Sequence, residues 1–201
     1  LANTDQFFLN VMMAVGKAIV DYARKIQEGT VGTTMTRNGK DFGIRIAGMG
    51  DEWFTAPVNM PHGLYFTGYT EDDANPDIGD SAITETVGVG AMVTVAAPAV
   101  TRFVGSGGGY DDALKISEEM NRICISNNPN WSIPNWNFKG ACLGIDAAKV
   151  VATGITPLIN TGIAHKKAGV GQVGAGTASA PLACFEKAIL AYAKKLGIET
   201  E

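Results

Sequence analysis

Apolar residues recur at every third or fourth position in several stretches of this 201-residue chain, and this spacing predicts amphipathic helices. The first helix is predicted from Phe8 to Ile26, with Thr4 and Asp5 as capping residues, and is expected to end at Gly29. The other predicted helices span residues 91–103 with an interruption at Pro98, 111–125, 146–151 with Asp146 as the cap, and about 179–196.

Alternating apolar and polar positions predict short strands elsewhere. Residues 31–36 and 42–46 flank Asn38-Gly39, a turn signal, so they are expected to form an antiparallel hairpin. Shorter strands are predicted at 53–55, 64–66 and 155–159, with an aromatic loop at 131–138. Helices and antiparallel strands in irregular order indicate an α+β fold, with long glycine-rich loops between short elements.

The length is sufficient for one domain or for two closely packed subdomains, 1–104 and 105–201. The chain begins at Leu1 and enters a predicted helix at once, so we interpret it as the C-terminal, catalytic-type region of a longer polypeptide. An exposed apolar patch or an interface is expected where the missing region or another chain docks.

Composition narrows the class of protein. No apolar run approaches the roughly 20 residues of a membrane span and no signal peptide is recognisable, so a cytoplasmic protein is expected. The net charge is −4 and the basic residues are scattered, which argues against nucleic acid as a partner. Three widely spaced cysteines and two histidines predict neither a disulfide framework nor a metal site, and no cofactor is expected.

The strongest chemical signal is the glycine-rich segment 160–176, predicted to be a loop between a strand and a helix. Its backbone N–H groups and polar side chains are typical of a cradle for an anion or a carbonyl group. The catalytic candidates in it are Asn160, Thr161, His165 and Gln172, and the anion-binding candidates are Gly162 and Gly171. The alternative is a tight loop that needs positive φ angles. Residues 169–174 match G-x-G-x-x-G but lack the context of a dinucleotide-binding fingerprint.

A second signal is residues 79–90, which lead into the predicted helix at Ala91. Gly88 and Gly90 are expected to leave free N–H groups at the helix start, where an anion binds favourably. Further candidates are the hydroxyls of Thr84 and Thr86, with Asp80 and Glu85 as supporting carboxylates. The alternative is ordinary capping and turn formation. The sequence predicts that segments 84–90 and 160–176 line one cleft, because both are rich in donors and poor in apolar anchors.

The hairpin turn adds two anion-binding candidates, Arg37 and Asn38. An arginine at this position can bind an anion through two parallel hydrogen bonds. The alternative is a solvated turn arginine.

Taken together, a set of short motifs resembles the YlbE/YahG-like family over almost the whole chain. The motifs are Arg37-Asn38-Gly39 with 41–44, Gly50-Asp51 with 53–57, 63–65, Gly79-Asp80-Ser81 with 84–86, 144–146, 159–162 and 169–176. The resemblance implies a bacterial cytoplasmic protein that accompanies FdrA-like proteins and carbamate kinase and is part of an oligomer. One branch of the family is a subunit of oxamate carbamoyltransferase in anaerobic allantoin breakdown, which converts oxalurate and phosphate to oxamate and carbamoyl phosphate.

This chemistry assigns roles to the candidate residues. Phosphorolysis of a carbamoyl group needs a held phosphate, donors for the oxyanion and a proton for the departing nitrogen. On this hypothesis Arg37 and the helix start hold anionic groups, segment 160–176 supplies the oxyanion donors and His165 is the acid. The competing hypothesis is a non-catalytic anion-binding or assembly subunit that partners an FdrA-like protein. A nucleotide-binding oxidoreductase is a weaker third hypothesis.

Overall fold

The α+β prediction is confirmed by the computed structural model, which describes residues 7–79 and 82–199. The strands of the described residues form three small antiparallel sheets. The first sheet has the order β1 (Gly32–Arg37), β2 (Asp41–Ile46), β3 (Phe54–Pro57). The predicted turn between its first two strands is confirmed, because Oδ1 of Asn38 accepts hydrogen bonds from the backbone N–H groups of Lys40 and Asp41.

Helix α6 (Leu182–Lys195) packs against β2 and β3, as an amphipathic C-terminal helix should. It buries Cys184 and Phe185 against the sheet side of the core, and Lys194 and Lys195 lie in its last turn. The chain then leaves the helix through Gly197, whose φ of +73° favours glycine.

The second sheet corrects the expected loop at 160–176. It has the order β4 (His62–Tyr65), β8 (Gln172–Ser179), β7 (Leu158–Ala164), so most of the segment is a β-hairpin. A Cβ atom at Gly63 would lie 2.2 Å from the carbonyl oxygen of Ala175, and one at Gly176 would lie 2.4 Å from that of His62. The glycines therefore allow β4 and β8 to approach closely. In the sequence, the same glycines look like those of a flexible loop.

The third sheet corrects the expected aromatic loop at 131–138. It is a hairpin of β5 (Cys124–Ile133) and β6 (Lys139–Ile145), joined by the short 3-10 helix η5 (Pro134–Trp136). The pairing is irregular between Asn128 and Ser132. This bulge accommodates the segment around Pro129, which lacks the backbone N–H that a regular ladder needs.

Helix α1 (Phe7–Asp21) is shorter than predicted. The chain turns into the 3-10 helix η1 (Ala23–Lys25) well before Gly29. The capping residues Thr4 and Asp5 lie outside the described residues.

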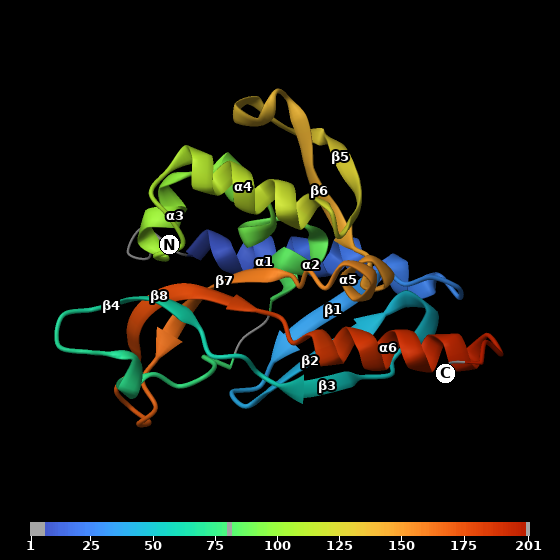
Figure 1. Cartoon of the computed structure of the whole chain (residues 1–201), viewed down its shortest axis with the longest axis horizontal. Helices are drawn as coiled ribbons and strands as arrows, with labels where there is room; N and C mark the ends of the chain where they lie inside the picture. The colour runs from blue at the N-terminus through green and yellow to red at the C-terminus, as the bar shows by residue number, and fades with distance from the viewer. Residues whose placement is uncertain (1–6, 80–81, 200–201) are drawn as a thin grey trace.

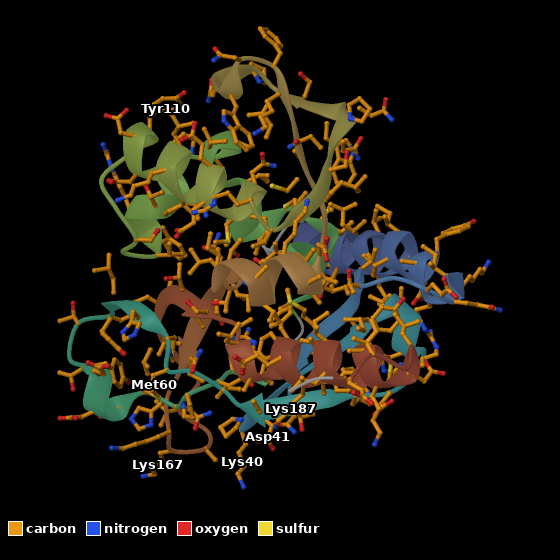
Figure 2. All side chains as sticks on the ribbon, turned by 45° about the vertical axis from the view of Figure 1, so that its right-hand side comes forward. Lys40, Asp41, Met60, Tyr110, Lys167 and Lys187 are labelled. Atoms are coloured by element: carbon orange, nitrogen blue, oxygen red, sulfur yellow. The ribbon has the colours of Figure 1, made fainter. Side chains whose placement is uncertain are left out.

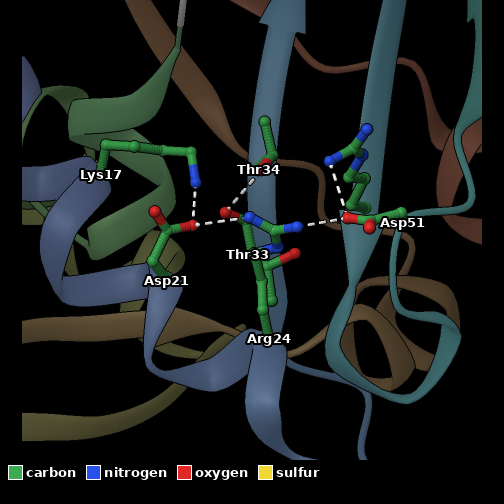
Figure 3. A network of polar contacts seen from close by, with 7 residues as sticks. Lys17, Asp21, Arg24, Thr33, Thr34 and Asp51 are labelled. Atoms are coloured by element: carbon green, nitrogen blue, oxygen red, sulfur yellow. Dashed lines mark hydrogen bonds and ion pairs between the residues drawn. The ribbon is translucent and has the colours of Figure 1, made fainter.

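Charged side chains fasten the end of α1 to the first sheet (Figure 3). Asp21 is paired with Lys17 and with Arg24, and Arg24 also contacts Asp51. Arg45 on β2 binds the same carboxylate of Asp51 at 3.1 Å. Such exposed pairs contribute about 0.2–1 kcal/mol each, so they set the position of the helix end more than they stabilise the fold.

The apolar stretch 91–103 does not form one helix. It follows the short helix α2 (Ile83–Val87) and divides into the 3-10 helix η4 (Gly90–Ala96) and the helix α3 (Ala99–Phe103). Val93 has the non-helical angles φ −135° and ψ 44°, and the expected interruption at Pro98 is confirmed.

The helices predicted at 111–125 and 146–151 are confirmed, although the first ends at Asn121 because the chain enters β5 at Cys124. They are α4 (Tyr110–Asn121) and α5 (Ala147–Thr153), and the side chain of Asp146 caps the latter by accepting the N–H of Ala148 at 3.0 Å. The remaining 3-10 helices are η2 (Ala47–Met49) and η3 (Glu71–Asp73). Within the described ranges, every helix is too short or too polar to cross a lipid bilayer.

Figure 1 shows how these elements are arranged. Helix α1 runs through the middle, with α3, α4 and the β5–β6 hairpin on one side and the two three-stranded sheets on the other. The main core runs from Met35 on β1 through Met92 on η4 to Phe185 on α6, whereas α1 packs through Val20 against Ile83 and Val87 of α2 in a separate cluster. In Figure 2, Tyr110 at the start of α4 lies at the opposite side of the molecule from Lys167 on the β7–β8 turn. Helices α1 and α3, the 3-10 helix η4 and strands of the second and third sheets surround the candidate site.

Candidate functional site

A cavity of about 950 Å³ lies where α1, α3, the α2–η4 segment and the β5–β6 and β7–β8 hairpins meet. Its volume is within the range of about 300–1,000 Å³ that is usual for small-molecule sites. Most of its wall is apolar, and the apolar residues are Phe8, Leu9, Met12, Ile78, Val89, Val93, Ala96, Val100, Phe103, Val104, Trp131, Ile133, Ala141 and Ala175. Such a wall lowers the local polarity and strengthens polar contacts made against it.

One side of the cavity is polar, and we call it the polar wall. Its residues come from the two segments that the sequence singled out: Thr84, Glu85 and Gly90 from the first, and Asn160, Thr161, Gly162 and Gln172 from the second. The expectation that the two segments line one cleft is therefore supported by the lining of the cavity. The reason given for it was wrong, because the cleft is mainly apolar and the donors occupy only part of its wall.

Glu85 is the central group of the polar wall. Its side chain is 3% exposed, and both of its oxygens accept hydrogen bonds. Oε2 accepts from the hydroxyl of Thr84 at 2.7 Å, while Oε1 accepts from the backbone N–H groups of Ala91 at 3.2 Å and Asn160 at 3.4 Å. Burial raises the pKa of Glu85, and these three donors, together with the backbone N–H of Glu85 itself, only partly oppose the shift.

The expected free N–H groups at Gly88 and Gly90 are not present as predicted. Gly88 ends α2 in the left-handed conformation and donates its N–H to the carbonyl of Glu85, so it is not at a helix start. Gly90 does begin η4, but the carboxylate of Glu85 occupies the space beside it, since a Cβ at Gly90 would lie 2.3 Å from Oε1. The group that occupies this helix start is therefore the protein's own Glu85 carboxyl.

Two hydroxyls of the same segment have different surroundings. Thr84 lines the cavity, whereas Thr86 is fully buried and donates to the carbonyl of Ala82. The structure thus gives Thr86 a role inside helix α2, away from the cavity lining.

Each strand of the β7–β8 hairpin contributes one side-chain amide to the polar wall. Among the described residues, none is hydrogen-bonded to the side-chain amide of Asn160, which lines the cavity. The amide of Gln172 donates to the carbonyl of Gly174 on its own strand at 2.8 Å. Asn160 is therefore available to a ligand, while Gln172 would have to exchange a partner to bind one.

Arg37 supports the polar wall from behind. Its guanidinium lies 3.2 Å from Asp77 and donates to the hydroxyl of Thr161 at 3.1 Å. Both charged side chains of the pair are almost fully buried, so the alternative of a solvated turn arginine is wrong. Asn38, the neighbouring candidate, holds the β1–β2 turn and does not line the cavity.

His165 lies on the β7–β8 turn and is not among the cavity-lining residues. Its Nδ1 accepts the N–H of Lys167 at 2.8 Å, and its Nε2 faces Asp73 at 3.7 Å. The ring also meets the edge of Tyr69, with the centroids 5.8 Å apart. Figure 2 shows Lys167, on the same turn, at the margin of the molecule. These contacts fix the ring in the turn and give the predicted acid role no geometric support at the cavity.

Gly171 has a φ of +92° in the β7–β8 turn, which favours the alternative of a glycine needed for its backbone conformation. Asp80 lies outside the described residues. Within those residues, no group of three or more His, Cys, Asp or Glu side chains is placed to hold a metal ion. The three cysteines are buried and unpaired, as core fillers are.

The sequence did not identify the aromatic part of the cavity. Phe8 was interpreted as a packing residue, Phe103 as the end of an apolar helix and Trp131 as part of a loop, yet all three line the wall. No local motif marks them, because their meeting depends on how distant elements pack.

Comparisons with known proteins agree with the resemblance seen in the sequence. A family model described as oxamate carbamoyltransferase subunit AllG matches residues 1–81. Over 98% of its length the chain is 60% identical to the oxamate carbamoyltransferase subunit AllG of Escherichia coli (strain K12), of which it covers 47%. It is 46% identical to the uncharacterized protein YahG of the same organism, of which it covers 42%.

A solved structure shares the fold. The crystal structure of a conserved protein of unknown function from Enterococcus faecalis V583 aligns with 95% of this chain at a TM-score of 0.90 and 44% identity, and the chain covers 45% of that protein. The chain thus spans about half the length of each relative that it matches.

Proposed function

We propose that this chain, which is similar over nearly its whole length to proteins of the YlbE/YahG-like family, forms part of a carbamoyltransferase subunit. The proposed reaction is phosphorolysis of a carbamoyl compound such as oxalurate, which gives carbamoyl phosphate and oxamate. The observation that carries the proposal is the cavity, where both glycine-rich segments meet on one polar wall inside an apolar shell.

The chemistry of the cavity fits the carbamoyl end of such a compound. A carbamoyl group is planar and carries a carbonyl oxygen and an NH₂ group, which need a donor and an acceptor. The amide of Asn160 offers both, and the hydroxyls of Thr84 and Thr161 lie on the same wall. The apolar shell, once a partner covers its open side, would keep water from competing with phosphate for the carbamoyl carbon.

The cavity does not supply charge for phosphate. Its lining residues include no lysine, arginine or histidine among those that the structure describes. Since phosphoryl groups are usually held by cationic side chains or metal ions, we propose that this charge comes from outside the chain, from a partner polypeptide such as an FdrA-like subunit. The similar protein of Escherichia coli is named as a subunit of oxamate carbamoyltransferase, and a subunit has partner polypeptides.

The experiment that tests the proposal fills the cavity without disturbing the core. Ala96 is exposed and lines the cavity, whereas its neighbour Ala97 is exposed and does not. In the assembled enzyme, Ala96→Trp should lower the rate of carbamoyl phosphate formation from oxalurate and phosphate at least tenfold, and the matched control Ala97→Trp should retain the wild-type rate. Equal rates for both variants would show that the reaction does not use this cavity.

A second candidate function rests on a separate observation. Helix α1 exposes an apolar face that includes Phe8 (67% exposed), Leu9 and Val11. Exposed apolar patches of this kind are typical of protein interfaces. This face favours an assembly role with a partner subunit, and that role predicts that the cavity variants leave the rate unchanged while α1 variants disrupt the complex.

A further inference from the structure

We propose that Glu85 exchanges a proton with the nitrogen that departs in carbamoyl transfer, and that it takes the acid role that the sequence assigned to His165. The inference rests on the proposed function and identifies a catalytic residue for it. It is carried by the position of the carboxyl group in the wall of the cavity, where both candidate segments meet.

Glu85 is the only titratable residue among the described residues that line the cavity. General acid catalysis needs a titratable group within hydrogen-bond reach of the reacting atom. His165 does not meet this condition, because its two ring nitrogens face Lys167 on the β7–β8 turn and Asp73 on η3. Of the residues that the sequence nominated, Glu85 is therefore the one that combines proton chemistry with access to the cavity.

The carboxyl group is held in one orientation. The N–H of Ala91 and the N–H of Asn160 fix Oε1, and the hydroxyl of Thr84 fixes Oε2. Gly90 leaves the space that Oε1 needs, because any Cβ there would clash with it. Each carboxyl oxygen has two lone-pair directions, so this set leaves Oε2 with a direction for a proton or a ligand. A carboxyl placed in this way acts without first having to reorient.

The surroundings favour the neutral acid. The charged and titratable groups on elements packed against α2 are Lys17 and Asp21 on α1, Arg37 on β1, and Lys139 and Cys142 on β6. None of them is hydrogen-bonded to Glu85. Arg37 is paired with Asp77, and Lys17 with Asp21. Burial therefore dominates and raises the pKa of Glu85.

A neutral carboxyl also removes a difficulty with the substrates. Oxalurate and phosphate are both anions, and an ionised carboxylate in an apolar cavity would repel them. A protonated Glu85 does not repel them and can donate. Carboxyl groups that stay protonated near neutral pH because of apolar surroundings are an established way to provide such a donor.

The proton balance of the step is complete. A phosphate oxygen bonds to the carbamoyl carbon, and the bond from that carbon to the oxamate nitrogen breaks with its electron pair on nitrogen. Glu85 gives its proton to this nitrogen, which becomes the NH₂ group of oxamate. The hydrogen of HPO₄²⁻ then passes to the Glu85 carboxylate, which restores the acid, and the total charge of −3 is the same before and after.

The test compares Glu85→Gln with Glu85→Asp in the assembled enzyme. Gln keeps the size and a donor but cannot release a proton, so kcat should fall by about 10²- to 10⁴-fold while KM changes little. Wild type should lose activity as the pH rises through the pKa of Glu85, and Gln should abolish this alkaline limb. Asp keeps an acid and should recover part of kcat together with the limb. The matched control Glu118→Gln changes an exposed carboxylate on α4 and should behave as wild type.

Each outcome decides the matter. An active Glu85→Gln enzyme, or a folded Glu85→Gln enzyme that keeps the alkaline limb, overturns the proton role and leaves the proposed function standing. A fall in kcat with His165→Gln that abolishes the limb assigns the proton to His165 instead. A wild-type complex that forms no carbamoyl phosphate from oxalurate and phosphate overturns the proposed function and this inference with it. If Glu85→Gln fails to fold, the Asp variant decides, because a lost alkaline limb in an active Asp enzyme also overturns the role.

Discussion

Replacing Arg37 by methionine should destabilise the fold by about 3–5 kcal/mol, because it leaves a buried carboxylate without its counter-charge. The side chains of Arg37 and Asp77 are 4% and 0% exposed, and their ion pair measures 3.2 Å. At an effective dielectric constant of about 20 their attraction amounts to about 5 kcal/mol. Desolvation of the two ions offsets much of this, so the intact pair adds little net stability while its rupture is costly.

The second variant separates the charge from the contacts. Asp77 also accepts the N–H of Gly39 at 2.7 Å, and asparagine keeps an acceptor there without the charge. Adding Asp77→Asn to Arg37→Met should therefore recover part of the lost stability. The free energy of unfolding is measured in urea with tryptophan fluorescence as the signal, for wild type, both single variants and the double variant.

Two results would refute this reasoning. A loss below about 1 kcal/mol for Arg37→Met would mean that Asp77 is readily solvated or neutralised when its partner is removed. Strictly additive effects of the two changes would mean that the charges do not interact. A confirmed result has a consequence for the cavity, because Arg37 also holds Thr161 on the polar wall.

Three further predictions follow from single contacts. Because burial raises the pKa of Glu85, the folded chain holds this proton more tightly than the unfolded chain, so stability from Glu85 is present below about pH 4.5 and is lost as pH rises through the folded pKa. Urea unfolding from pH 5 to pH 9 should show Glu85→Gln gaining on wild type as pH rises, and a constant difference would refute it. In the same assay, Gly63→Ala should lower the free energy of unfolding by about 1–3 kcal/mol, because the new Cβ meets the β8 backbone. The control Gly108→Ala has room for its Cβ and should lower it by less than about 1 kcal/mol, and equal losses would contradict the close approach of the strands. Val11→Asp should leave the melting temperature within about 2 °C and weaken assembly in sedimentation experiments, and an unchanged complex would exclude this face of α1 as the interface.

The sequence predicted those elements that are determined by residues only a few positions apart. The β1–β2 turn, the Asp146 cap and helix α6 were predicted because turn residues, caps and helical periodicity act within a few positions. The β7–β8 and β5–β6 hairpins were missed for the opposite reason. The glycines of β8 are needed because His62 pairs with Thr177, far away in the sequence, and no local pattern distinguishes this need from a flexible loop.

The site was predicted in the same partial way. The sequence identified both segments of the polar wall, since polar residues and glycines were concentrated there. It could not rank the residues within them, because rank depends on where each side chain points. His165 is turned toward Asp73, Gly88 closes a helix, and Glu85, given only a supporting role in the sequence, holds the centre of the wall.

The catalytic and assembly roles need not exclude one another, because one helix serves both surfaces. Phe8 and Leu9 line the cavity and are also exposed on α1, so a partner that covers this face of α1 also covers the cavity beside it. The cavity has an acid and an amide but no cationic side chain among its described lining, while phosphate needs positive charge. We therefore expect docking to add the charge and exclude water in the same step. On this view phosphate binds weakly to the chain alone and tightly to the complex, and calorimetry on both decides it, since equal affinities would separate assembly from the site.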